Sequence, residues 1–125
     1  MNNSNSNISI EILTNGSQEE TFVLKRRIRV TFRGVEVAVT SGFKSDGASV
    51  PRFFWRTVFP PMNRRALRAA IIHDYLYRVC SYGLSRKEAD ELFLYLMLWD
   101  GVRPDRAYKA YFGVRLFGKK SWRSI

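Results

Sequence analysis

The stretch His73-Asp74-Tyr75-Leu76-Tyr77-Arg78-Val79 decides how the second half of this sequence is interpreted. It contains the chain's single histidine, followed at once by a carboxylate, within an apolar run that has helical periodicity. A buried polar group without a partner costs about 1–3 kcal/mol, and a buried unpaired charge costs more. The sequence therefore predicts that partners for His73 and Asp74 lie elsewhere in the chain.

Three helices are predicted in the second half, from their start and stop signals. Asn63 is the expected cap of the first helix. Ser85-Arg86-Lys87-Glu88 has the pattern of a capping box and marks the start of the second. Pro104 and Gly118 mark the start and the stop of the third. The expected ranges are 63–79, 85 to just before Gly101, and 103–116. Few residues join the first two helices, so we expect them to be antiparallel neighbours.

The first third of the chain predicts strands, since β-branched residues alternate with polar ones between turn signals at Asn15-Gly16 and Gly34. The expected ranges are 8–13, 21–25, 27–33 and 35–40. Ile28, Val30 and Phe32 would share one face, opposite a basic face. We therefore expect an α+β fold, in which a small N-terminal antiparallel β-meander of three or four strands packs on a C-terminal bundle of three helices.

Length and composition fit one domain, because 125 residues can bury a single core. Residues 1–7 are rich in Asn and Ser and are expected to form a disordered or partner-bound arm, with one domain over 8–125. No apolar run approaches the roughly 20 residues that span a bilayer, and no secretory signal is expected. The single Cys80 excludes an internal disulfide and fits a reducing cytosol.

The net charge of +10 predicts attraction to an anionic surface: lipid, a cell-wall polymer or an acidic protein. The basic residues are dispersed, and no zinc finger, basic zipper or ribonucleoprotein motif is present, so sequence-specific nucleic-acid binding is not expected. The aromatic run Phe53-Phe54-Trp55 either packs on the core or forms an exposed lip for a lipid or partner surface.

A partner for His73 is predicted on the second helix. Asp90 lies there on an apolar stripe with Phe93 and Met97, whereas His73 and Tyr77 share a face of the first helix. His73 and Asp90 lie at similar heights above the connecting loop. We expect Asp90 to accept a hydrogen bond from His73, which would fix the imidazole tautomer and raise its basicity.

A metal site is a second interpretation of the same region. Asp46 and Gly47 lie in a predicted turn that exposes backbone carbonyls, and Asp74 adds a carboxylate. Oxygen ligands suit a hard cation such as calcium. A transition metal bound by His73, Asp46, Asp74 and Asp90 is one alternative, and a purely structural polar network is another.

Three motifs follow one another in the chain: Gly42-Phe43-x-x-Asp46-Gly47-Ala48-Ser49-Val50-Pro51, His73-Asp74-x-Leu76-Tyr77 and Arg86-x-x-Ala89-Asp90-x-x-Phe93. In this order they resemble the phage- and prophage-encoded domain of unknown function 1353, from about Phe43 to Gly118. The resemblance implies a viral or prophage origin, other phage proteins as partners, and a location in the bacterial host cytoplasm or the virion. It implies no established activity.

The chain is also similar, more distantly, to prokaryotic phospholipase A2, in which a glycine-containing loop precedes a His-Asp-x-x-Tyr helix and a second Asp. That resemblance implies that His73 is the general base, that Asp90 and Tyr77 orient it, and that Asp74 and the carbonyls of the loop around Asp46-Gly47 bind calcium. The chain departs from that family in its single cysteine and its glycine-poor loop.

Three functions are left open, and with them whether the protein is an enzyme. The first is a calcium-dependent, phospholipase A2-like hydrolase acting at an anionic membrane. The second is a non-enzymatic phage tail, baseplate or assembly component in which the His/Asp motif is structural. The third is a small effector that binds a host protein or nucleic acid. A catalytic His73 needs access to solvent, whereas a structural one has both nitrogens engaged by protein groups.

Overall fold

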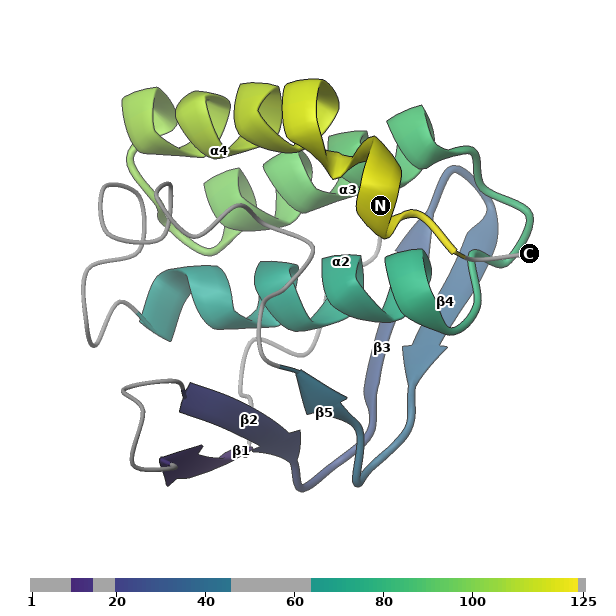
Figure 1. Ribbon diagram of the computed structural model, residues 1–125, viewed down its shortest axis with the longest axis vertical. Coiled ribbons are helices and arrows are strands. Elements are labelled where there is room, and N and C mark those ends of the chain that lie inside the picture. Colours follow the sequence, from purple (N-terminus) through teal and green to yellow (C-terminus); the bar gives the residue numbers. More distant parts are fainter. Residues whose placement is uncertain (1–9, 15–19, 46–63, 124–125) are drawn as a thin grey trace. The chain divides into compact units, whose positions relative to one another are not determined.

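The computed structural model describes the backbone of residues 10–14, 20–45 and 64–123, and the side chains of 23–44 and 65–123. The chain divides into two compact units, residues 1–47 and residues 48–125. The first unit contains strands and the second contains helices (Figure 1), which confirms the α+β fold class. The predicted arm lies outside the described ranges, and the single domain over 8–125 stays a prediction.

Strands of the first unit form two antiparallel sheets, one with the order β1-β2-β5 and one with the order β3-β4. Their bounds are β1 Ile10–Thr14, β2 Glu20–Leu24, β3 Ile28–Phe32, β4 Val35–Val39 and β5 Lys44–Ser45. The sequence does not predict β5, because a strand of two residues is too short to show alternation. The ladder also breaks between β2 and β3, so the strands do not form one continuous meander.

The β3–β4 hairpin follows the sequence pattern closely. Arg33 and Gly34 both have positive φ, 51° and 79°, as a two-residue hairpin turn requires. The side chains of Ile28, Val30 and Phe32 are buried, as predicted, and alternate with more exposed positions. On the exposed side, Arg29 forms a 2.7 Å ion pair with Glu36 of the neighbouring strand.

The second unit contains the three predicted helices. Its elements are the 3-10 turn η1 Arg64–Ala66, the helices α2 Leu67–Arg78, α3 Arg86–Trp99 and α4 Pro104–Phe117, and the 3-10 turn η2 Gly118–Ser121. The first helix begins later than predicted, after a 3-10 turn, and the expected cap Asn63 lies outside the described residues. None of the helices in the described part of the chain is long and apolar enough to cross a membrane.

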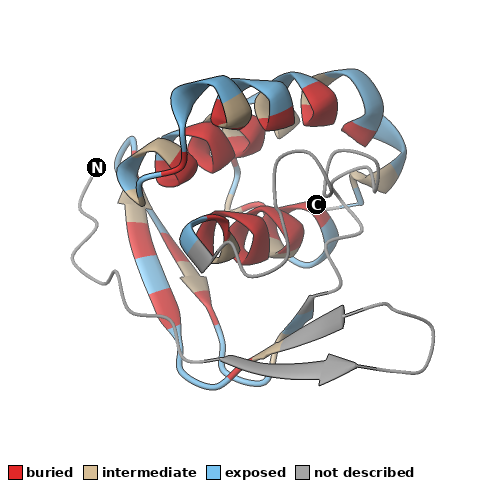
Figure 2. Cartoon of the chain, turned by 90° about the vertical axis from the view of Figure 1, so that its left-hand side faces the viewer, coloured by how far each residue is buried: buried red, intermediate tan, exposed pale blue. Residues whose placement is uncertain are grey.

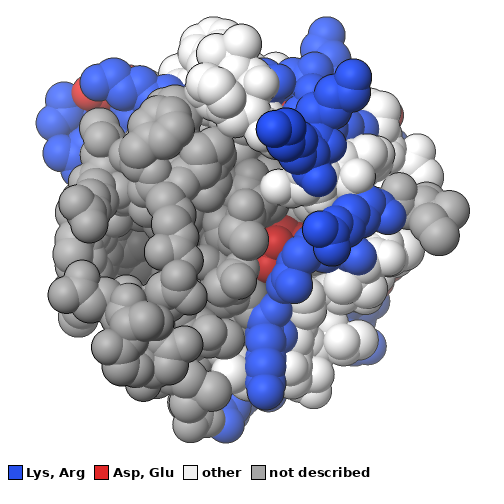
Figure 3. Space-filling view, viewed as in Figure 1, with Lys and Arg blue, Asp and Glu red and all other residues white. Residues whose placement is uncertain are grey.

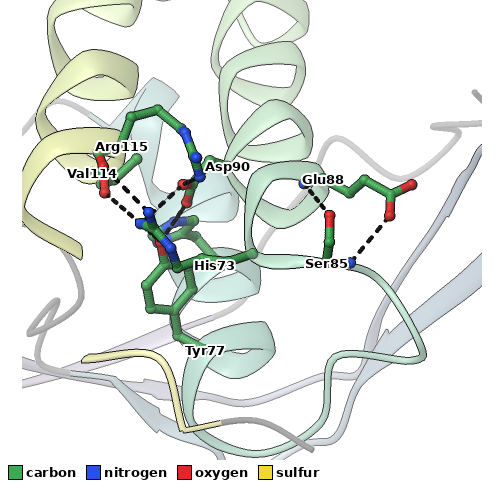
Figure 4. A network of polar contacts seen from close by, with 8 residues as sticks. His73, Tyr77, Ser85, Glu88, Asp90, Val114 and Arg115 are labelled. Carbon is green, nitrogen blue, oxygen red and sulfur yellow. Dashed lines mark hydrogen bonds and ion pairs between the residues drawn. The ribbon is translucent and has the colours of Figure 1, made fainter. Parts of the chain in front are cut away.

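Predicted signals at the helix ends are largely confirmed. The Glu88 amide donates to Ser85 Oγ and the Ser85 amide donates to Glu88 Oε1, both at 3.1 Å, which completes the capping box (Figure 4). Pro104 occupies the first turn of α4. Gly118 follows α4 but keeps a right-handed φ of −81°, so the chain continues into η2. A left-handed backbone conformation is therefore not the reason for a glycine at this position. The reason is the close approach to Tyr77, described with the site below.

Small buried residues let the helices approach closely. On α2 they are Ala69 and Ala70, on α3 Ala89, and on α4 Ala107 and Ala110. Helix α3 packs between α2 and α4, and the buried positions gather on the facing sides (Figures 1 and 2). This packing brings polar side chains of α2 and α4 into contact with Asp90 of α3.

A partly buried ion pair confirms that α2 and α3 run antiparallel. The fully buried Arg68, at the start of α2, donates two hydrogen bonds to Asp100, directly after the end of α3, at 2.9 and 2.5 Å. Paired charges of this kind offset the cost of burying either one alone.

Candidate functional site

The centre of the site is the fully buried carboxylate of Asp90 on α3. Nε2 of His73 lies 2.8 Å from its Oδ1, and the Tyr77 hydroxyl donates to the same oxygen at 2.6 Å. Arg115 of α4 donates to Oδ2 at 2.8 Å. Donors from two helices thus converge on one carboxylate from a third (Figure 4). The hydrogen bond predicted between His73 and Asp90 is confirmed.

The surroundings keep Asp90 ionised. Burial by itself would raise the pKa of its carboxyl, but the hydrogen bond from His73, the positive charge that His73 carries when protonated, and the hydrogen bonds of Tyr77 and Arg115 outweigh it and hold the pKa below the ordinary 3.8. For Tyr77, burial and the neighbouring Asp90 raise the pKa well above its usual 10.0, so the phenol stays a neutral donor. An ionised acceptor at Nε2 favours the tautomer with its proton there and its lone pair on Nδ1.

Aromatic rings hold the imidazole in place. The His73 ring is fully buried and lies 4.2 Å from the ring centroid of Tyr77 and 4.5 Å from that of Phe93. His73 is also engaged in at least one interaction beyond these contacts and the bond to Asp90. The ring is therefore fixed by packing as well as by its hydrogen bond.

Arg86 connects this network to the end of α4, and the sequence assigns it no role. Its guanidinium donates to the carbonyls of Val114 at 3.0 Å and Arg115 at 3.3 Å, both in the last turn of α4. The Val114 carbonyl also accepts the amide of Gly118, so Arg86 adds a second donor there. It also donates to the Tyr77 hydroxyl at 3.3 Å and lies 3.6 Å from Asp90. The spacing of four residues between Arg86 and Asp90 on one helix is a sequence signal that could have predicted the ion pair between them.

Gly118 allows the chain to pass directly over Tyr77. A Cβ atom at Gly118 would lie 2.8 Å from the Tyr77 hydroxyl oxygen and 3.2 Å from its Cε2. Beyond η2, the Trp122 ring meets the Tyr77 ring edge-on at 5.1 Å, and the Arg123 amide donates to the Tyr77 carbonyl at 2.8 Å. The glycine is thus required for space at the site.

Comparison with known proteins identifies the family. Residues 22–114 match the family described as "Protein of unknown function (DUF1353)". The chain belongs to this family. Over 85 residues it is 32% identical to "Uncharacterized protein y4jT" of Sinorhizobium fredii (strain NBRC 101917 / NGR234). That match covers 68% of this chain and 25% of the relative, so the chain spans about a quarter of the relative's length. No solved structure matches.

Membership of the DUF1353 family confirms the resemblance on the three motifs. The phage origin and the likeness to phospholipase A2 stay predictions, because neither similarity carries a described activity or source of that kind. The first motif from Asp46 onward, and the aromatic run around Trp55, lie outside the residues that the structure describes.

The predicted calcium site is tested only at Asp74. Its fully buried carboxylate accepts two hydrogen bonds from Arg78, at 2.9 and 2.7 Å, so the guanidinium occupies both oxygens. A cation at Asp74 would have to displace Arg78. Within the described ranges, no group of three or more His, Cys, Asp or Glu residues could hold a metal ion. Asp46 and Gly47 fall outside those ranges, so calcium stays a prediction that the arrangement of Asp74 does not support.

Proposed function

We propose that this DUF1353 protein is a hydrolase in which His73 is the general base and Asp90 orients it. The observation that supports this most is the convergence of His73, Tyr77 and Arg115 on one buried, ionised carboxylate. A buried ion network is a costly way to hold helices together, since well-packed apolar residues of similar volume often stabilise as much or more. Its function is therefore better sought in chemistry than in stability.

The proposed step uses only groups of this chain. His73 is fully buried and is engaged beyond its bond to Asp90, so the step requires the site to open to water. Nδ1 of His73 then accepts a proton from water, and the resulting hydroxide attacks the acyl carbon of an ester. The imidazolium that forms is stabilised by the Asp90 carboxylate 2.8 Å from Nε2. The tetrahedral intermediate then expels the alkoxide, which takes the proton back from Nδ1. Tyr77 and Arg115 act as positioning residues because they hold Asp90 in place.

The proposed substrate is a phospholipid ester. Its support is the net charge of +10, which favours anionic surfaces, and the order of the histidine and aspartate motifs, which is similar to phospholipase A2. No step is assigned to calcium, because Arg78 occupies the carboxylate of Asp74.

The test is fatty-acid release from vesicles of ester-linked anionic phospholipid, with and without added calcium. We expect activity in the unaltered protein and a loss of about a hundredfold or more in His73→Gln and Asp90→Asn. Asp100→Asn is the matched control, since it removes the same charge from a pair outside the site. Circular dichroism verifies that each variant folds. Absence of release by the unaltered protein under both conditions would refute the proposal.

A second candidate is a non-enzymatic structural protein, such as a phage tail, baseplate or assembly component. The observation that favours it is the complete burial of His73, Tyr77 and Asp90. On this alternative, His73→Gln would unfold or destabilise the protein, and the unaltered protein would release no fatty acid from any ester.

A further inference from the structure

We infer that the outer face of α4 binds an anionic lipid surface. This outer face consists of Tyr108, Phe112 and Leu116, spaced four residues apart along the helix and 45, 57 and 73% exposed. The opposite side of α4 is buried, which fixes the direction in which the face points (Figure 2). The inference extends the proposed hydrolysis by naming the surface on which the protein would act.

The outer face is a continuous apolar surface. The Tyr108 and Phe112 rings lie 6.3 Å apart between centroids, and Tyr111 meets Phe112 edge-on at 5.4 Å. Single exposed apolar residues are ordinary on a soluble protein. Three large ones aligned on one helix form a patch of the kind that marks an interaction surface.

Basic residues border this apolar surface. Seven Lys or Arg residues and one Asp lie between Arg103 and Arg123, and the Asp is paired with Arg103. Lys109, Lys119 and Lys120 are exposed. Figure 3 shows two groups of basic side chains with an uncharged stretch between them, where α4 runs. Charge complementarity therefore selects an anionic partner.

A lipid surface fits this combination better than a nucleic acid or an acidic protein. An amphipathic helix that lies in the membrane interface buries aromatic and aliphatic side chains while flanking lysines reach the headgroups. Leu116 is the most exposed of the three and is aliphatic, so it cannot stack on a nucleotide base. At roughly 1.5 Å per residue, α4 offers about 21 Å of helix for such a contact.

The same helix connects the outer face with the proposed catalytic pair. Arg115 precedes Leu116 and reaches the other way, to Oδ2 of Asp90. A helix seated on the lipid surface by Leu116 would therefore place the Asp90 network directly behind α4, one helix away from that surface.

The experiment measures binding without hydrolysis. Vesicles of ether-linked phosphatidylglycerol mixed with ether-linked phosphatidylcholine contain no ester to cleave, so a failure of docking is separable from a failure of catalysis. By flotation, we expect the full chain to bind these vesicles at least about tenfold more tightly than pure phosphatidylcholine vesicles at about 0.1 M salt, and much less so at about 0.5 M salt.

Paired variants locate the surface. Lys119→Gln with Lys120→Gln should weaken binding about tenfold or more, whereas Arg26→Gln with Arg27→Gln, which removes equal charge from exposed positions of the first unit, should change it less than about threefold. Phe112→Gln with Leu116→Gln should also weaken it about tenfold, and Val79→Gln, at an exposed position of the second unit outside α4, should not.

Two results would overturn the inference. Equal losses for the two pairs of basic variants would mean that net charge alone attracts the protein to vesicles. Unchanged vesicle binding in Phe112→Gln with Leu116→Gln, together with a shift from dimer to monomer in analytical ultracentrifugation, would assign the outer face to a second copy of the chain.

Discussion

Gly118 and the hydroxyl oxygen of Tyr77 lie so close that a Cβ atom added at Gly118 would be 2.8 Å from that oxygen. The contact joins the start of η2 to the last turn of α2, and the Arg86 guanidinium would lie 3.4 Å from the same added atom. The position of the chain after α4 and the orientation of Tyr77 therefore depend on one another.

Gly118→Ala should destabilise the protein by about 1–3 kcal/mol, because the Tyr77 hydroxyl is held by Asp90 and cannot move aside at low cost. The backbone is not the cause, since φ at Gly118 is −81°. Denaturant unfolding of Gly118→Ala, Tyr77→Phe and the double variant measures the effect. Removal of the hydroxyl should relieve part of the clash, so the double variant should be more stable than the sum of the single effects predicts. Strict additivity would contradict the contact.

Asp90 should contribute to stability in a pH-dependent way. Its folded pKa lies below the ordinary 3.8, so the folded state binds fewer protons there than the unfolded state. The stabilisation is present above pH 3.8 and is lost as the pH falls through the folded pKa. Unfolding free energies measured from neutral pH downward should therefore fall less steeply below that value in Asp90→Asn.

At neutral pH, Asp90→Asn should cost about 3 kcal/mol or more, because it removes the buried carboxylate that accepts hydrogen bonds from His73, Tyr77 and Arg115 together. Asp105→Asn is the control, since that carboxylate pairs with Arg103 on the exposed surface and should be worth less than about 1 kcal/mol. Equal costs for the two variants would mean that the buried network is not formed.

Arg78 should compete with calcium for Asp74. Arg78→Met removes the partner of a fully buried carboxylate and should destabilise the protein by about 3 kcal/mol. Arg29→Met, at an exposed pair, should cost less than about 1 kcal/mol. Added calcium should raise the melting temperature of Arg78→Met and leave that of the unaltered protein unchanged. A calcium-dependent rise in the unaltered protein that Asp74→Asn abolishes would contradict this assignment and favour the calcium site.

Local signals explain how much of the fold the sequence predicts. The capping box at Ser85, the proline at 104 and the alternation from Ile28 to Phe32 each act within a few residues, and the structure confirms them. The break of the strands into two sheets depends on pairings between distant residues, and a strand as short as β5 has no periodicity to detect.

In the candidate site too, contacts between residues close in sequence could be predicted, whereas contacts that depend on helix packing could not. The His73–Asp90 bond could be predicted because two helical faces and a short connection place the residues at one height. The contact of Arg115 with Asp90 spans 25 positions in the sequence and depends on how α4 packs on α3, so spacing could not indicate it. Asp74 and Arg78 lie four residues apart on one helix, a spacing that favours an ion pair and that the predictions from sequence leave unused.

The central claim is that His73 is a working base and not a structural group. Because the chain has a single histidine, the ultraviolet absorbance of the carbethoxylated imidazole formed with diethyl pyrocarbonate reports on this residue alone. Catalysis requires that the lone pair on Nδ1 be reachable by water, so we expect the histidine of the folded protein to be modified near neutral pH. A folded protein whose histidine does not react, although it reacts fully once the chain is unfolded, would contradict the account.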